Sequence, residues 1–218
     1  MRHRANLRPA PPDEHSVVLL REHRTAVEFA RTLSTIFNPF LTATALFVIV
    51  SHAYTSSVAA FWALSSSGIL FFTVAPLCVV VYLYITGRIS DFEMSQRFER
   101  ERVFAGFIII YFLAAVTLTL TRAPVQLVAI TWGYWWMAVA TMIITRWWKI
   151  STHAFGITGP FVVLVLLFGV QALPYSPLIL LVCWARIYLA RHTLGQVLGG
   201  CALAAGSTLV FFKLFRLV

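Results

Sequence analysis

The sequence predicts an all-α fold: a polytopic transmembrane helical bundle of six or seven spans, with a polar site at one membrane face. Two observations carry this prediction. First, 60% of the 218 residues are hydrophobic and only 11% are charged, whereas soluble domains are about half apolar and about one-quarter charged. Second, the mean hydropathy is +0.83, and the apolar residues gather in runs that approach the roughly 20 residues a membrane-spanning helix needs.

The N-terminal segment, residues 1–35, is polar and basic, and it precedes a membrane domain over residues 36–218. Residues 1–13 are rich in Pro and Arg and are predicted to be disordered. Residues 14–35 predict a helix on the membrane surface, because several apolar side chains fall roughly on one side of it. A solvated helix that leads into the first span is an equal alternative. The apolar side chains are Leu20, Val27, Ala30 and Leu33.

Seven apolar segments follow one another along the membrane domain. Pro174 and Ser176 interrupt the apolar run over 156–190 and predict a tight turn. The segment after this turn is short, so we expect its end to lie below the membrane surface, within a polar pocket. The predicted spans are 36–54, 64–86, 103–121, 125–146, 156–173, 176–190 and 193–216.

Three polar clusters are expected at the same face of the membrane. They are the charged loop 87–102, the segment 147–156 with His153, and the segment 183–200 with His192. Two predicted spans separate each cluster from the next, so the chain returns to the same face each time. That face, together with the N-terminus, carries fourteen of the seventeen Lys and Arg residues. The positive-inside rule therefore predicts that it is cytoplasmic.

The charge distribution restricts the chemistry of these clusters. All eight acidic residues lie at or before Glu101, so the last 117 residues cannot supply paired Mg²⁺-binding aspartates or a complete Ser-His-Asp triad. The three cysteines lack metal-type spacing. Two histidines beside Arg and Lys favour an oxyanion site, in which Arg binds phosphate, one His attacks phosphorus and the other protonates the leaving oxygen. Neither a metal nor a cofactor is expected.

The cluster around His192 resembles a signature of the type 2 phosphatidic acid phosphatase family, which includes lipid phosphate phosphatases and vanadium haloperoxidases. Ala185 and Arg186, five further residues, His192, three further residues and Gln196 are similar to the family's third signature. That signature reads Ser-Arg, five residues, His, three residues, Asp. The resemblance implies that His192 is the nucleophile and that Arg186 binds the phosphate.

The other two clusters extend this resemblance over roughly residues 87–205, and thus imply a phosphatase-like membrane domain. Ile-Ser-Thr-His at 150–153 looks like the second signature, Pro-Ser-Gly-His, and makes His153 the general acid. The loop 87–102 stands where the first signature, Lys, six residues, Arg-Pro, would fall. Arg97, with Arg100 or Arg102, would replace its cations, although no pair there has the family's spacing. Further phosphate-binding groups are Lys149 and a backbone N–H near Thr152.

Four positions depart from the family pattern: Ile150, Thr152, Ala185 and Gln196. Gln196 matters most, because it replaces the Asp that would orient the nucleophilic His. Its carbonyl oxygen can accept the imidazole N–H and fix the tautomer, but it cannot offset positive charge. Loss of such a carboxylate costs a serine protease about four orders of magnitude in rate. The acidic residues on the same face that could replace it are Asp91, Glu93, Glu99 and Glu101.

The sequence therefore predicts hydrolysis of a lipid phosphomonoester or a (poly)prenyl diphosphate through a phosphohistidine intermediate, without choosing among lipids. A catalytically weakened relative, which binds lipid phosphates or supports a membrane assembly, is the first alternative, and the departure at Gln196 favours it. A haem or pigment carrier with His153 and His192 as ligands ranks lower, because Arg186 and Lys149 suit an anion better. The expected partners are a lipid phosphate substrate and membrane lipids. No nucleic acid is expected, and an oligomer or larger membrane assembly stays open.

Overall fold

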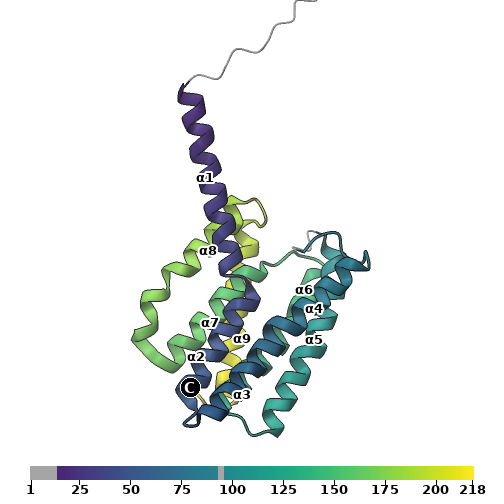
Figure 1. The fold of residues 1–218 in the computed structure, drawn as a ribbon, viewed down its shortest axis with the longest axis vertical. Coiled ribbons are helices and arrows are strands. Elements are labelled where there is room, and N and C mark those ends of the chain that lie inside the picture. Colours follow the sequence, from purple (N-terminus) through teal and green to yellow (C-terminus); the bar gives the residue numbers. More distant parts are fainter. Residues whose placement is uncertain (1–13, 93–95) are drawn as a thin grey trace, which may run out of the picture.

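The chain folds into helices that pack side by side, with one helix extending from the end of the bundle (Figure 1). The computed structural model describes residues 14–92 and 96–218, with side chains from Arg24 onward apart from that of Arg97. The elements in chain order are α1 (Glu14–Ile36), α2 (Pro39–Tyr54), α3 (Val58–Ile69), the π-helical turn η1 (Leu70–Val74), α4 (Ala75–Ile85), α5 (Arg97–Leu120), α6 (Val125–Thr145), α7 (Thr152–Phe168), the 3₁₀ segment η2 (Gly169–Tyr175), α8 (Pro177–Tyr188) and α9 (Leu194–Leu214).

Short polar side chains cap several of these helices. Asn38 accepts hydrogen bonds from the backbone N–H groups of Phe40 and Leu41 at the start of α2, both at 3.0 Å. Ser151 and Thr193 cap α7 and α9 in the same way. Such caps satisfy N–H groups that have no partner within the helix. The caps Ser151 and Thr193 lie within two residues of the predicted histidines, so helix initiation and site geometry are coupled.

The prediction of a polytopic helical membrane bundle is confirmed. In the described part of the chain, five helices are long and apolar enough to cross a membrane, and the pair α1–α2, bent by 47°, makes a sixth span if its two parts are counted together. The five are Val58–Ile85, which joins α3, η1 and α4, Phe98–Leu120, Val125–Thr145, Thr152–Tyr175 and Leu194–Leu214.

The predicted span over 176–190 is wrong as a full crossing. The helix found there, α8, has 12 residues, and at 1.5 Å per residue it covers only about 18 Å of a hydrocarbon core about 30 Å thick. The preceding break exists, because the 3₁₀ segment η2 and Ser176 separate α7 from α8. Apolar composition alone did not distinguish this short returning helix from a span.

The connections α4–α5, α6–α7 and α8–α9 lie at one end of the bundle, the end from which α1 extends (Figure 1). These connections carry or adjoin the three polar clusters. The clusters therefore meet at one end, because α8 runs back toward it even though it is too short for a full span. The N-terminal helix expected over 14–35 corresponds to α1. The disorder predicted for residues 1–13 lies outside the described residues.

An aromatic cluster joins four elements in the middle of the bundle. Phe72 of η1 stacks on Tyr111 of α5 with ring centroids 5.2 Å apart, and it packs against Tyr134 of α6 at 4.9 Å and Phe47 of α2 at 4.6 Å. All four side chains are buried. Large rings in contact fix the relative positions of these helices, and the two tyrosines form the inner end of the cavity described next.

Candidate functional site

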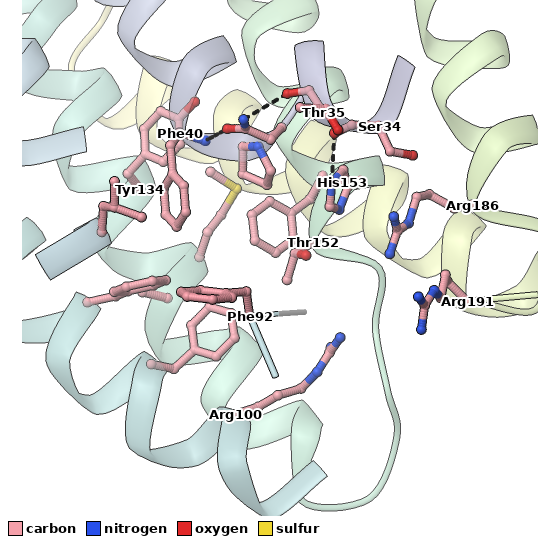
Figure 2. A pocket seen from close by; sticks show the side chains of 18 of the residues that line it. Ser34, Thr35, Phe40, Phe92, Arg100, Tyr134, Thr152, His153, Arg186 and Arg191 are labelled. Carbon is pink, nitrogen blue, oxygen red and sulfur yellow. Dashed lines mark hydrogen bonds between the residues drawn. The ribbon is translucent and has the colours of Figure 1, made fainter. Parts of the chain in front are cut away.

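A cavity of about 620 Å³ lies between the helices at the end of the bundle where the polar clusters meet. Its volume is in the range of pockets that hold small ligands. One part of its wall is polar and the other is aromatic (Figure 2). The polar part consists of Arg31, Ser34, Thr35, Asn38, Arg100, Thr152, His153, Arg186 and Arg191. The apolar part includes Phe40, Leu77, Phe92, Phe104, Phe107, Tyr111, Tyr134, Met137, Ala138 and Phe155.

One face of α5 runs the length of this cavity. Arg100, Phe104, Phe107 and Tyr111 all line it, and their spacing of three or four residues places them on one side of a helix. From Arg100 to Tyr111 the helix rises about 16 Å. The same helix therefore provides a cation near its N-terminal end and an apolar wall that continues along it.

Arg100 is held in a buried position at the polar end of the cavity. Its side chain is 2% exposed, and its Nη1 donates a hydrogen bond of 2.9 Å to the carbonyl oxygen of Ile150. Of the two arginines predicted to replace the first signature whose side chains the structure describes, Arg100 lines the cavity. Arg102 lies outside it, where it donates a 2.7 Å hydrogen bond to the carbonyl oxygen of Arg88. The side chain of Arg97 lies outside the described residues.

The segment 150–153 is tied directly to the start of α9. The backbone N–H of Ser151 donates to the carbonyl oxygen of Gln196 at 3.1 Å. A Cβ atom on Gly200 would lie 2.6 Å from the carbonyl oxygen of Ser151, so only glycine allows this approach. Gly200 thus permits close packing of α9 beside the segment 150–153. The segment 150–153 and the start of α9 thus form one unit.

The end of α8 positions Arg186 and His192 relative to each other. The backbone N–H groups of Arg191 and His192 both donate to the carbonyl oxygen of Arg186, at 3.1 and 3.2 Å. This turn requires Ala190 in the left-handed region, with φ of 52°. Arg186 itself is 3% exposed. The five-residue spacing between the Arg and the His therefore has a physical basis in a helix-terminating turn.

The ring of His192 is oriented by Gln196. Nδ1 of His192 lies 3.2 Å from Oε1 of Gln196, and the same oxygen accepts the backbone N–H of Thr193 at 3.2 Å within a capping box. An N–H can only donate, so the Thr193 contact identifies this atom of the amide as the oxygen. Nδ1 of a neutral His192 then carries the proton, and Nε2 carries the lone pair. This is the tautomer that a nucleophile needs.

The ring of His153 is oriented by the last turn of α1. Its Nε2 lies 3.2 Å from the carbonyl oxygen of Ser34, drawn as a dashed line in Figure 2. A carbonyl only accepts, so Nε2 carries the proton. Nδ1 is buried and has no hydrogen-bond partner among the residues that the structure describes. The two histidines therefore hold opposite tautomers.

Positive charges gather around His192 and Lys149. Burial, followed by the nearby guanidinium groups of Arg100 and Arg186, lowers the pKa of His192 to about 4, although its bond to Gln196 works in the opposite direction. Burial and then Arg100, Arg186 and Arg191 also lower the pKa of Lys149, against a smaller effect of Asp91. His192 is thus neutral at pH 7. Such a site favours an anion, which would screen these cations from one another.

The predicted site residues are largely brought together, with three exceptions. Arg100, Thr152, His153 and Arg186 line one cavity, and Lys149 interacts electrostatically with Arg100 and Arg186. Arg102 lies elsewhere, and the side chain of Arg97 is outside the described part of the structure. His192, 6% exposed, is not among the residues that line the cavity. It adjoins the cavity through Arg100 and Arg186.

Two of the candidate carboxylates are engaged away from His192. Glu99 accepts hydrogen bonds from the backbone N–H and the hydroxyl of Ser90, at 2.7 and 3.2 Å. Glu101 lies 3.9 Å from Arg146 at the surface. Glu93 is outside the described residues. The group that contacts the Nδ1 side of His192 is therefore the Gln196 amide.

Sequence reasoning missed the contribution of α1 and α2 to the cavity. Arg31, Ser34, Thr35 and Asn38 line it, yet they lie more than 110 positions before His153 and belong to no recognised motif. Arg191 also lines it, although its position next to His192 gave the only hint. The helical spacing of Phe104, Phe107 and Tyr111 after Arg100 was visible, but an apolar stripe is the normal pattern of any membrane helix.

Comparison of the chain with protein-family models, with curated proteins and with solved structures finds no match.

Proposed function

We propose that this protein binds a lipid phosphate in the cavity and hydrolyses it through a phosphohistidine at His192. The observation that carries the proposal is the two-part wall of the cavity. Cations and His153 gather at one end of the cavity, and from Arg100 the wall continues about 16 Å along α5 through Phe104 and Phe107 to Tyr111. An amphiphile with an anionic head and an apolar tail matches this wall in both charge and polarity.

The proposed reaction uses the ring nitrogens that these contacts leave available, Nε2 of His192 and Nδ1 of His153. Arg100, Arg186 and Lys149 bind the phosphoryl oxygens. Nε2 of His192 attacks phosphorus, so that an N–P bond forms while the bond from phosphorus to the lipid oxygen breaks. A protonated His153 gives its Nδ1 proton to that oxygen. Nδ1 of His153 then takes a proton from a water molecule whose oxygen attacks phosphorus. The N–P bond breaks, Nε2 of His192 leaves with its electron pair, and inorganic phosphate is released.

Family membership and orientation are part of this proposal. The spacing of Arg186, His192 and Gln196, and of the segment 150–153, supports a divergent type 2 phosphatidic acid phosphatase. The gathering of Lys and Arg at the end of the bundle with the cavity supports a cytoplasmic site by the positive-inside rule. The substrate class stays a lipid phosphomonoester or a prenyl diphosphate.

A second candidate function is binding of a lipid phosphate without turnover. Two observations favour it. Gln196 supplies no negative charge to His192 and also serves as a member of the capping box, and His192 is not among the residues that line the cavity. A phosphate held by Arg100 and Arg186 would then be bound but not attacked, and the protein would act as a sensor or scaffold.

Phosphate release from a panel of lipid phosphates by detergent-purified protein, with EDTA present, separates the two candidates. Wild-type protein and His192→Ala are compared with a matched control, His52→Ala, because His52 is an exposed histidine in the last turn of α2. Hydrolysis predicts release that persists in EDTA, survives in the control and is lost in His192→Ala. Binding of the lipids without release by wild-type protein would contradict hydrolysis and support the binding function.

A further inference from the structure

The break between α1 and α2 leaves a carbonyl group without its helical partner. Pro39 is the first residue of α2, and a proline disfavours helical backbone in the residue before it. Asn38 is accordingly extended, with φ of −71° and ψ of 155°. In a continuous helix its N–H would reach the carbonyl oxygen of Ser34, four residues earlier. Because α1 ends at Ile36, that oxygen is available to another donor.

His153 is the donor that meets this carbonyl oxygen. The bond from its Nε2 to Ser34 spans 119 positions of the chain and joins the start of α7 to the end of α1. The last carbonyl groups of a helix also carry the negative end of its dipole, which favours a positive charge nearby. The Ser34 carbonyl thus both fixes the ring and stabilises its protonated form.

Packing of α1 on α8 maintains this contact. Ala30 and Leu33 are buried and pack with Ala185, and Phe29 lies 6.2 Å from Trp184 between ring centroids. The 47° bend at the break lets α1 lean on α8 while α2 continues in the bundle. Straightening the pair would direct α1 away from α8 and would also return the Ser34 carbonyl to its own helix.

We propose that the α1–α2 break is a positioning device for the site, in which the Ser34 carbonyl holds His153 as the Nε2–H tautomer and leaves Nδ1 to exchange a proton with the ligand. The role in proton transfer rests on the proposed hydrolysis. The docking of α1 on α8 then regulates the site, because an undocked α1 takes away the group that orients its acid. Residues 30–36, which belong to no signature, become part of the active site.

The test combines a spectroscopic and a kinetic measurement on the full-length protein. ¹⁵N spectra of histidine-labelled protein in detergent report which ring nitrogen carries the proton, and His153→Gln identifies the relevant signals. The double variant Asn38→Ala/Pro39→Ala allows a continuous helix. Pro124→Ala removes a proline that also precedes a helix, α6, at the other end of the bundle, and serves as the control.

We expect wild-type protein and the control to show a single Nε2–H tautomer for His153, and its Nδ1 signal to shift when inorganic phosphate is added. In the double variant we expect a mixture of tautomers. Its kcat for a lipid phosphate should fall at least about tenfold, since a general acid contributes about 10²-fold or more, while its KM should change less than about twofold.

The double variant also replaces Pro39, which packs closely against Gly156. A second variant is therefore needed to distinguish the proposed effect from misfolding. Phe29→Ala removes a half-exposed ring that contacts α8 and leaves the break unchanged. It should show a partial tautomer mixture and a smaller loss of kcat. An unchanged His153 tautomer in both variants would overturn the inference, as would a mixed tautomer with unchanged kcat. No release by wild-type protein with any lipid would overturn the proposed hydrolysis and, with it, the role in proton transfer. The phosphate-dependent shift would still report the positioning of the ring.

Discussion

The two histidines of the site are oriented by groups of different origin. His192 contacts the side chain of Gln196, four residues later on the first turn of α9. His153 contacts a main-chain carbonyl of α1, 119 positions earlier. The local contact fixes the proton on Nδ1 and the distant contact fixes it on Nε2. The first arrangement leaves Nε2 of His192 with its lone pair, and the second leaves Nδ1 of His153 as the atom that can take up and deliver a proton.

This difference teaches which part of a site a short motif can contain. The residues from Arg186 to Gln196 form a helix end, a tight turn and a helix start. Residues that are close in sequence therefore determine the orientation of His192. The orientation of His153 depends on a helix break at Pro39 and on the packing of α1 against α8. Substitutions at the two positions should therefore fail in different ways.

The largest expected effects are the losses of activity on replacing the two histidines. For His153 the loss should depend on the leaving group of the substrate, and for His192 it should not. His192→Ala should abolish phosphate release from every substrate, because no nucleophile remains. His153→Ala should lower kcat for a lipid phosphate by about 10²- to 10⁴-fold, the usual contribution of a general acid. It should have a much smaller effect with a nitrophenyl phosphate, whose leaving oxygen needs no proton. Steady-state kinetics measure kcat of both variants with both substrates. Equal losses of kcat with the two substrates in His153→Ala would contradict its proposed role as the general acid.

The next largest effect compares two arginines of α5. Arg100→Ala should weaken binding of a lipid phosphate by about 10- to 100-fold, since a hydrogen bond to a charged group contributes about 1.5–3 kcal/mol. Arg102→Ala should change it less than about twofold, because that side chain contacts Arg88 outside the cavity. Titration calorimetry with a short-chain lipid phosphate measures both. Equal losses would place the phosphate elsewhere.

Gln196→Glu tests whether a carboxylate improves the orientation of His192. Glutamate preserves the capping box at this position and supplies the negative charge that the amide lacks. We expect kcat to rise at least about tenfold, because orienting carboxylates contribute up to about 10⁴-fold in other hydrolases. Gln196→Ala should lower kcat and destabilise the start of α9 by about 1 kcal/mol. A decrease in kcat with glutamate would show that the amide is the better partner.

The pH dependence of stability should reflect His192. Its folded pKa of about 4 lies below the ordinary value of 6.5, so between these values the unfolded chain binds a proton that the folded protein does not. The free energy of unfolding should therefore fall by about 2 kcal/mol as the pH drops from 6.5 to 4. Thermal unfolding in detergent measures this, and His192→Gln should flatten the profile. An unchanged slope would contradict the lowered pKa.

The smallest expected effect concerns the turn between Arg186 and His192. Ala190 has φ of 52°, a region that costs a residue with a Cβ about 1–2 kcal/mol. Ala190→Gly should remove that strain and raise the free energy of unfolding by up to about 1 kcal/mol, with phosphate release unchanged, as read from unfolding curves and activity on the same preparation. A loss of stability would mean that the turn has another conformation.

The fold class and the meeting of the polar clusters could be predicted because they depend on the hydropathy of each segment and on the order of the segments along the chain. Apolar runs mark membrane helices, and the clusters meet at one end of the bundle even though α8 proved too short to span. The misassignment of 176–190 has a simple cause. Hydropathy shows that the residues are apolar, but it does not show where the helix begins and ends. The helix Pro177–Tyr188 is short, and it packs against α1 and α7.

The rest of the site depends on contacts between distant segments. Nothing in the sequence near Ser34 indicates that its carbonyl reaches His153, because a backbone group carries no residue-specific pattern. The choice of Arg100 over Arg102 likewise follows from which side of α5 faces the cavity. The position of His192 beside the cavity, and not in its lining, needed the three-dimensional arrangement as well.

Phosphorylation of His192 tests the central claim most directly. Wild-type protein is mixed with a lipid phosphate in EDTA, quenched in alkali to preserve phosphohistidine, digested, and analysed by mass spectrometry, with His52→Ala as the matched variant. The predicted result is one phosphoryl group on the peptide that contains His192, in both proteins, formed before inorganic phosphate appears. An unmodified His192 in protein that releases phosphate, or that binds the lipid without releasing it, would contradict phosphohistidine catalysis.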